Sequence, residues 1–325
     1  MAVYTQLTGE RLAEIVAQYD VGELVSAKGI AEGVSNSNWI VETTRNRFIL
    51  TMYESRTDIS DLPFFLGLLD HLAAKGGPVP RTIHDRAGDS YRLVDGKAVA
   101  LIEFLPGVSV DMPTPAQAQS VGRALAGMHL SVADFPQSRQ QMLGLDSWEA
   151  VMSECGSEQL ASIDPTLPDL AFAELGSMTD NWPRGLPQGV VHCDLFPDNV
   201  LMLGNEVSGL IDFYFAATDA FAYDLAVTHA AWCFADSGQT FRPEVSAALL
   251  GGYQEVRGLQ EDERTALPVL ARGACMRFIS SRAWDWLNTP AAALVTRKDP
   301  MDFARRLQFY RDNGETIFAD AGQAG

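Results

Sequence analysis

Short apolar runs alternating with polar residues dominate the first hundred residues and predict β-strands. Five runs have this character: 27–33, 38–43, 47–53, 90–93 and 97–104. Asn46 marks a turn between the second and third runs, and Asp95-Gly96 is typical of the two-residue turn of a β-hairpin. The N-terminal third of the chain is therefore predicted to be rich in strands.

Two helices are predicted within this strand-rich part. Thr8 precedes a helical pattern that runs to about Tyr19, because a threonine hydroxyl can cap the first turn. Residues 62–75 also repeat apolar positions at helical spacing and end at Gly76-Gly77-Pro78.

Leu105-Pro106-Gly107 interrupts the strand pattern, and helical periodicity prevails beyond it. The predicted helices are 115–131, 147–154, 169–181, 220–235, 243–256, 261–287 and 299–313. The pattern predicts an α+β protein with a small β-rich lobe, residues 1–104, and a larger, mainly helical lobe, residues 105–325. The hinge between them is expected at about 103–107.

Composition narrows the classes of partner. The 325 residues include 42 acidic and 24 basic side chains, a formal net charge of −18, which disfavours nucleic acid and anionic membranes as partners. The four cysteines form no C-x-x-C pair and are expected to be reduced, buried thiols. The first eighteen residues lack the basic and apolar regions of a signal peptide, so a cytoplasmic location is expected.

The most informative stretch lies between residues 190 and 213. His192, Asp194 and Asn199 form the pattern H-x-D-x-x-x-x-N, and Asp212 follows the apolar pair Leu210-Ile211. Taken singly, H-x-D can be a turn and Asn199 a cap. Taken together and in this order, they are typical of phosphoryl transfer, in which one acid orients the nucleophile and an amide and a second acid hold a metal.

The pattern resembles that of protein kinases, which carry H-R-D-x-x-x-x-N and D-F-G. Here Cys193 replaces the arginine, and Asp212-Phe213-Tyr214 replaces D-F-G. With these departures the chain resembles the aminoglycoside phosphotransferase and choline kinase group, whose bilobal, protein-kinase-like fold is then expected.

The resemblance implies a role for each residue of the pattern. Asp194 would orient the acceptor hydroxyl and accept its proton, and Asn199 and Asp212 would hold Mg²⁺ on the phosphates of ATP. His192 and Asp224 would support the catalytic loop. Asp224 can equally be a favourable carboxylate at a helix N-terminus.

Nucleotide binding is expected between the lobes. The Gly- and Asn-rich segment 29–38 contains Gly33, Ser35 and Asn36, whose backbone amides can approach phosphate oxygens, although such residues also mark an ordinary hairpin turn. Glu103 and Leu105 occupy the expected hinge, where backbone groups can pair with adenine.

One position departs from the kinase pattern. Kinase folds usually place a lysine on the third strand, paired with a glutamate of the next helix. Thr51 stands where that lysine is expected, and a threonine cannot supply its charge. The usual ion pair is not carried over to this chain, although Arg56 is a nearby basic residue.

Other segments narrow the resemblance to the bacterial homoserine kinase of this fold. They are V-Y-T-Q-L-T, Y-D-V-G-E-L, K-G-I-A-E-G-V-S-N-S-N-W, F-I-L-T-M-Y-E, D-L-P-F-F-L-G-L-L-D-H-L-A-A-K-G, L-I-D-F-Y-F-A and R-F-I-S-S-R-A-W-D-W-L. The likeness covers about 3–312, and Thr51 fits this family. It implies ATP-dependent phosphorylation of the side-chain hydroxyl of L-homoserine on the way to threonine.

Homoserine is a small zwitterion, and its carboxylate calls for a two-pronged arginine contact. Arg277 and Arg282 are the predicted partners, and Tyr214, next to the metal-binding acid, can either reach the substrate or serve only in packing. Each arginine can equally form a surface ion pair. Two other functions stay open: a kinase for another small hydroxylated amine, and a silent nucleotide-binding regulator, which the presence of Asp194, Asn199 and Asp212 together disfavours.

Overall fold

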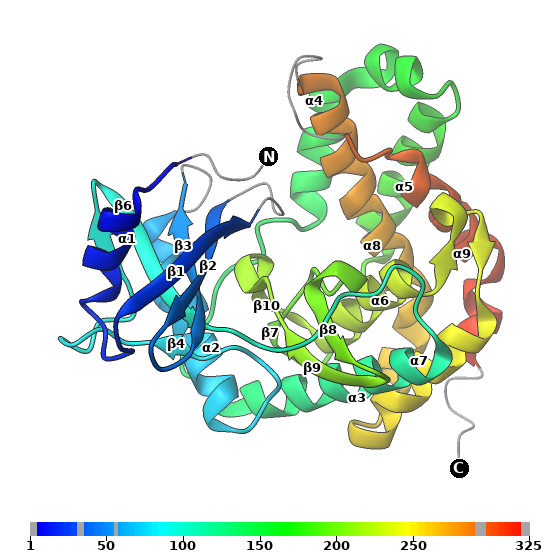
Figure 1. The fold of residues 1–325 in the computed structure, drawn as a ribbon. Coiled ribbons are helices and arrows are strands. Elements are labelled where there is room, and N and C mark those ends of the chain that lie inside the picture. Colours follow the sequence, from blue (N-terminus) through cyan, green and yellow to red (C-terminus); the bar gives the residue numbers. More distant parts are fainter. Residues whose placement is uncertain (1–4, 31–35, 55–57, 290–296, 320–325) are drawn as a thin grey trace. The chain divides into compact units, whose positions relative to one another are not determined.

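The computed structural model describes residues 5–30, 36–54, 58–289 and 297–319. The chain divides into two compact units, Met1–Gly107 and Val108–Gly325. The sequence places the boundary after residue 104, within the same Leu105-Pro106-Gly107 break. The first unit is rich in strands and the second is mainly helical, so the α+β prediction is confirmed (Figure 1).

An antiparallel six-stranded sheet forms the first unit. Its order is β1(Leu24–Ile30), β2(Asn36–Thr43), β3(Arg47–Tyr53), β6(Lys97–Glu103) and β4(Thr82–Ile83), and β5(Arg92–Val94) also pairs with β6. The turn between β5 and β6 has positive φ at both Asp95 and Gly96, 52° and 80°, as the predicted hairpin turn requires.

Helices accompany this sheet. α1(Gly9–Val16) starts at Thr8, whose side chain accepts a hydrogen bond from the backbone N–H of Arg11. α1 buries Leu12 and Ile15 in one apolar cluster with Leu50 and Leu101 of the sheet. α2(Leu62–Ala74) lies beyond the 3-10 turn η1(Ile59–Asp61) and contacts β4. Both helices were predicted, but α1 ends earlier than expected.

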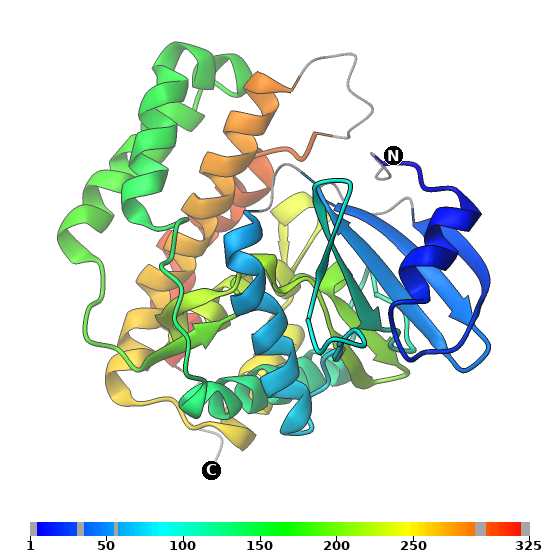
Figure 2. The ribbon, with the colours of Figure 1, turned by 90° about the vertical axis from the view of Figure 1, so that its left-hand side faces the viewer.

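The second unit is built from seven main helices in its described residues: α3(Pro115–Ser131), α4(Leu145–Ile163), α5(Leu167–Asn181), α6(Phe221–Trp232), α7(Pro243–Val256), α8(Glu261–Asn288) and α9(Met301–Ala319). Helix α8 packs against α4, α5, α6 and α9 (Figures 1 and 2). Helix α4 is longer than predicted and is interrupted at Gly156, where φ is 69°. Among the described residues, no helix combines the length and apolar character that crossing a bilayer requires.

Helices α3 and α7 approach closely through glycines. A Cβ atom on Gly122 would lie 2.2 Å from the carbonyl oxygen of Leu249, and one on Gly252 would lie 2.1 Å from that of Gln119. No side chain fits at such distances, so these glycines permit the packing. The close contact fixes α3, which carries a residue of the site, against α7.

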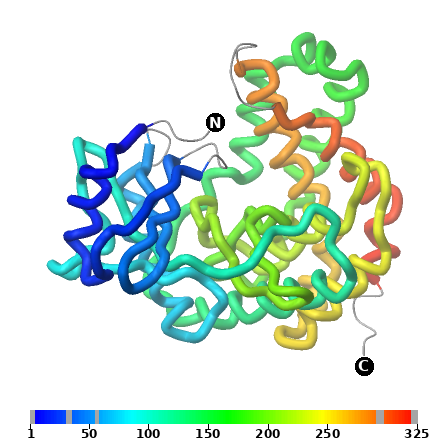
Figure 3. Tube along the Cα trace, in the orientation of Figure 1, coloured from blue at the N-terminus to red at the C-terminus, as the bar shows by residue number. Residues whose placement is uncertain are grey.

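Small strand pairs frame the H-x-D loop and the segment after Asp212. β7(Gln188–Val191) leads into the loop and β8(Val200–Leu203) leaves it, whereas β9(Glu206–Leu210) leads to Asp212 and β10(Ala217–Ala220) follows it. β7 pairs with β10, and β8 pairs with β9. The two segments therefore lie together, in the green to yellow-green part of the trace in Figure 3.

Short 3-10 turns and strands also belong to the second unit. The 3-10 turns η3(Pro197–Asn199) and η4(Phe213–Phe215) lie within the two functional segments. The short strands β11(Phe234–Ala235) and β12(Thr240–Phe241) pair with each other beyond α6. These strands and β7 to β10 were missed from the sequence, because runs of two to five residues carry little periodicity.

Candidate active site

Asp224 fixes the backbone of the H-x-D loop through hydrogen bonds. This carboxylate, on the first turn of α6, is fully buried and accepts hydrogen bonds from the backbone N–H groups of His192, at 2.8 Å, and Cys193, at 2.7 Å. Burial opposes its ionisation, but the hydrogen bond from His129 and the surrounding donors outweigh that penalty and lower its pKa. A charged Asp224 thus holds the loop that presents Asp194.

His192 joins the two functional segments. Its Nε2 donates to the carbonyl oxygen of Ile211 at 3.0 Å, and its Nδ1 accepts from the backbone N–H of Asp194 at 3.2 Å. Burial lowers the pKa of His192, so the ring is neutral, as this pair of hydrogen bonds requires. The histidine therefore supports the segments that precede Asp194 and Asp212 rather than exchanging protons with a ligand.

Asp194 and Asn199 are in direct contact. The side-chain amide of Asn199 donates to the backbone oxygen of Asp194 at 2.8 Å and to its Oδ2 at 3.2 Å. This use of the amide N–H leaves the Asn199 side-chain oxygen with no protein donor among the described residues. The side chain of Asp194 is 17% exposed, which gives a ligand access to its carboxylate.

Negative charge accumulates around Asp194 and Asp212. Asp212 follows β9 with a left-handed φ of 64° and retains a solvent-exposed surface. Desolvation by neighbouring protein atoms, together with the charges of Asp194 and Asp198, raises the pKa of Asp212 to about 7. Desolvation also raises the pKa of Asp194, and the charge of Arg277 opposes that rise.

The donor set suits a hard divalent cation. A cation at Asp212 would remove the repulsion that raises this pKa, and the Asn199 oxygen would be a neutral ligand beside it. No group of three or more His, Cys, Asp or Glu side chains able to hold a metal occurs among the described residues. A site with two protein ligands, completed by water and phosphate oxygens, fits Mg²⁺ better than it fits zinc.

A residue that the sequence pattern does not reveal completes the support of Asp224. His129 of α3 is buried, its Nε2 donates to Asp224 at 2.9 Å, and its Nδ1 accepts from the Tyr253 hydroxyl at 2.7 Å. Arg257 donates to the same hydroxyl at 3.2 Å and to Glu263 at 2.9 Å. Nothing in the spacing signals this network, because its members come from three separated parts of the chain: His129, Asp224 and residues 253–263.

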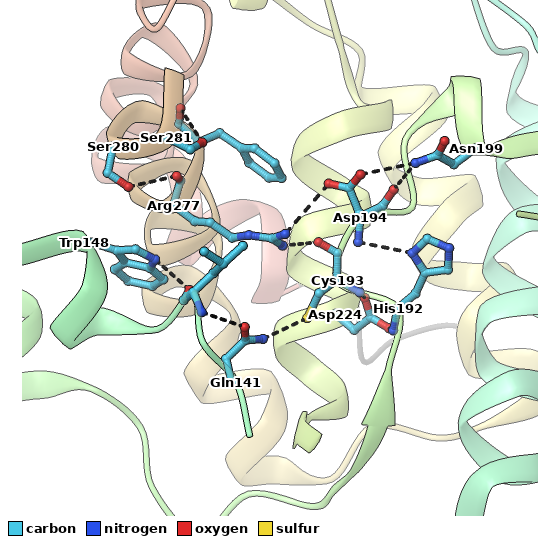
Figure 4. A network of polar contacts seen from close by, with 12 residues as sticks. Gln141, Trp148, His192, Cys193, Asp194, Asn199, Asp224, Arg277, Ser280 and Ser281 are labelled. Atoms are coloured by element: carbon cyan, nitrogen blue, oxygen red, sulfur yellow. Dashed lines mark hydrogen bonds and ion pairs between the residues drawn. The ribbon is translucent and has the colours of Figure 1, made fainter. Parts of the chain in front are cut away.

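The two arginines predicted for substrate lie in protein contacts. Arg277 of α8 points toward Asp194 and Cys193, and 3% of its side chain is exposed (Figure 4). Arg282 donates to Asp302 and to the Asp299 carbonyl, each at 3.1 Å.

Tyr214 and a further arginine flank the segment after Asp212. Tyr214 is partly exposed in η4. Arg139, which no sequence signal singled out, is also partly exposed and donates to the Ala216 carbonyl at 3.2 Å.

The predicted nucleotide contacts belong to the first unit. Gly33 and Ser35 lie outside the described residues. Asn36 begins β2 and is buried, and Leu105 follows β6 and is partly exposed. Glu103 ends β6 in an ion pair with Arg81 at 3.1 Å, which lowers its pKa.

Thr51 is integrated into the sheet of the first unit. It is 3% exposed on β3, and its hydroxyl donates to the side-chain oxygen of Asn38 on β2 at 2.8 Å. Arg56 lies outside the described residues.

Comparison with known proteins identifies the family of this chain. Residues 26–259 match the phosphotransferase enzyme family. The chain is 48% identical over 311 residues to the homoserine kinase of Methylobacterium radiotolerans, covering 96% of each, and 48% identical over 322 residues to that of Acidiphilium cryptum, covering 99% and 100%. The chain belongs to the homoserine kinase family. The resemblance inferred from the sequence is thereby confirmed.

Solved structures confirm the fold of this family member. Amicoumacin kinase hAmiN in complex with AMP-PNP, Ca²⁺ and Ami superposes with a TM-score of 0.67, covering 97% of this chain and 94% of that one at 14% identity. Choline kinase from Cryptosporidium parvum superposes with a TM-score of 0.66, covering 97% and 98% at 14% identity. At such identities the likeness shows the fold, which is that of small-molecule kinases.

Proposed function

We propose that the chain transfers the γ-phosphoryl group of ATP to the side-chain hydroxyl of L-homoserine, giving O-phospho-L-homoserine and ADP. The observation that carries the proposal is the 48% identity to homoserine kinases along almost the whole chain, together with Asp194, Asn199 and Asp212 in one cluster. Neither alone suffices, since the cluster defines the chemistry and the identity defines the acceptor.

Each residue of the cluster has a part in this reaction. Asp194 would receive the acceptor hydroxyl at its partly exposed carboxylate, hold it in line with the phosphorus atom and take its proton. Asn199 and Asp212 would hold Mg²⁺, which neutralises charge on the phosphates when it is bound. His192 and Asp224 would keep the loop in place through the hydrogen bonds described above.

Nucleotide binding is proposed for the glycine-rich segment that includes Gly33 and Ser35, for Asn36, and for the backbone around Glu103 and Leu105. The support is the strand arrangement of the first unit and the nucleotide complexes of proteins with the same fold. The acceptor would then lie near Asp194 and Tyr214, and Asp194 would contact its hydroxyl group.

An acceptor panel tests the function directly. Purified protein is incubated with ATP, Mg²⁺ and L-homoserine, L-serine, choline, 3-aminopropan-1-ol or kanamycin, and ADP release is followed. Phosphorus NMR of the product identifies the phosphorylated oxygen. L-homoserine is expected to give the highest kcat/KM. A preference for a carboxylate-free amino alcohol would favour the alternative of a kinase for another hydroxylated amine, and no ADP with any acceptor would favour a silent regulator.

A further inference from the structure

Cys193, the residue directly before Asp194, has a backbone conformation that needs support. Its φ is 60°, in the left-handed region that non-glycine residues seldom adopt. Such a conformation persists where the surrounding structure imposes it. Because Cys193 immediately precedes Asp194, its backbone sets the direction in which the Asp194 side chain leaves the loop.

Both polar groups of the Cys193 backbone are held by charged side chains. Its N–H donates to Asp224 at 2.7 Å, and its carbonyl oxygen accepts a hydrogen bond from Nη1 of Arg277. Asp224 belongs to α6 and Arg277 to α8, so two helices clamp one residue (Figure 4). The anion binds the donor and the cation binds the acceptor, and each contact is charge-assisted.

Arg277 is itself fixed against movement. Its guanidinium lies 5.4 Å from the ring centre of Phe215 and 4.9 Å from that of Phe278. Only 3% of its side chain is exposed, whereas a group that receives a substrate carboxylate from solvent needs an accessible face. These contacts are typical of a buried arginine that stabilises neighbouring parts of the protein.

The geometry toward Asp194 supports the same conclusion. Nη2 of Arg277 lies 3.8 Å from Oδ1 of Asp194, within the range of an ion pair but too far for a hydrogen bond. The arginine can therefore stabilise the charged carboxylate without occupying the oxygen that an acceptor hydroxyl must reach. The thiol of Cys193 adds no charge here, because burial raises its pKa well above the usual value.

We propose that Arg277 is a positioning residue for phosphoryl transfer, which clamps the Cys193 carbonyl and thereby aims the Asp194 carboxylate, and that it does not bind the substrate carboxylate. This assignment rests on the proposed function only in naming the reaction. The sequence suggested that Arg277 binds the carboxylate of the substrate. The positioning role does not require the substrate to carry a carboxylate.

Kinetics with two acceptors separate the two roles. Arg277→Lys and Arg277→Ala are compared with the wild type on L-homoserine and on 3-aminopropan-1-ol, which lacks the carboxylate. Arg272→Lys is the matched control, because Arg272 also lies on α8 and pairs with a buried acid, Glu174 at 2.6 Å, away from the loop.

A positioning role predicts a fall in kcat for both acceptors. Loss of a charge-assisted hydrogen bond corresponds to roughly a ten- to hundredfold change. The KM for homoserine and the ratio of kcat/KM between the two acceptors should stay near their wild-type values. Guanidinium ions added to Arg277→Ala should restore part of kcat, and Arg272→Lys should keep full kcat. A raised KM for homoserine with normal kcat, and a collapsed ratio, would overturn the proposal.

Hydrogen exchange tests the clamp without any turnover. Amides in residues 188–199 should exchange faster in Arg277→Lys than in the wild type and in Arg272→Lys, while peptides of α9 should be unchanged. Unaltered exchange in 188–199 would overturn the proposal. If the wild type phosphorylates no acceptor, the proposed function fails, but this measurement still decides on the clamp. If Arg277→Ala does not fold, Arg277→Lys carries both tests.

Discussion

At the scale of single residues, the site holds acidic side chains close together although their negative charges repel one another. Desolvation and the charge of Asp194 raise the pKa of Asp212, whereas the charge of Arg277 opposes the rise that desolvation causes in the pKa of Asp194. This difference fits the roles proposed for the two acids, because Asp194 has the guanidinium of Arg277 3.8 Å away, whereas Asp212 would be neutralised by a bound cation.

Asp194→Asn tests the assignment of the base. The amide is nearly the same size, so the Asn199 contact and nucleotide binding should persist, while kcat should fall by ~10²–10⁴-fold because the amide cannot accept the proton. Kinetics and ATP titration of the purified variant measure both. Asp198→Asn removes a nearby exposed charge and should lose far less. Near-normal turnover by Asp194→Asn would exclude this residue as the base.

The two proposed metal ligands, Asn199 and Asp212, are expected to contribute unequally. Asp212→Ala should raise the Mg²⁺ concentration needed for half-maximal activity more than Asn199→Ala does, because a carboxylate contributes charge and an amide only a dipole. Mg²⁺ titrations at fixed ATP give both values. Unchanged Mg²⁺ dependence in both variants would place the metal elsewhere.

At the scale of elements, the fold depends on pairings that local patterns describe only partly. The strand over 47–53 and the helices over 115–131 and 243–256 were predicted with the bounds that the structure shows, because their periodicity is strong and their ends carry turn or capping residues. The strands around the H-x-D loop were not, since β7 pairs with β10 across many intervening residues. The motif could be read from the sequence, but the elements that shape it could not.

The hydrogen-bond network of His129, Asp224 and Tyr253 could not be predicted from the sequence either. Its contribution to stability can be measured. His129→Leu would leave the Asp224 carboxylate buried with one donor fewer, and Tyr253→Phe would remove only a neutral hydroxyl. The free energy of unfolding from urea titrations should fall by ~1–3 kcal/mol in His129→Leu and by less in Tyr253→Phe. Equal losses would show that Asp224 does not depend on this histidine.

Thr51→Lys tests whether β3 would support ATP binding better if it carried the lysine that kinase folds usually place on this strand. The side chain is 3% exposed and hydrogen-bonded to Asn38, so a lysine would place an ammonium group in a buried position. The variant should have a lower Tm than Thr51→Val, which loses only the hydrogen bond, and neither should gain affinity for ATP. A gain in kcat or ATP affinity would instead mean that Thr51 occupies a working lysine position.

At the scale of the whole molecule, the identity of the acceptor is carried by the entire chain. The catalytic motif is common to kinases of many alcohols, and proteins of this fold at 14% identity include an amicoumacin kinase and a choline kinase. What singles out homoserine is likeness along 96% or more of the chain. Specificity for a zwitterion must then come from charged groups around Asp194 that no motif identifies.

The acceptor carboxylate should therefore matter to the wild type, and one arginine other than Arg277 should recognise it. Arg139 is partly exposed and donates to the Ala216 carbonyl in the segment that follows Tyr214, whereas Arg282 forms an ion pair with Asp302. Arg139→Lys should lower kcat/KM for homoserine by roughly ten- to hundredfold, because an ammonium cannot reproduce a two-pronged contact. It should leave 3-aminopropan-1-ol nearly unaffected, and Arg282→Lys should change neither preference. A loss shared equally by both acceptors would assign Arg139 to the fold, and normal kinetics in Arg139→Lys would exclude it from the carboxylate site.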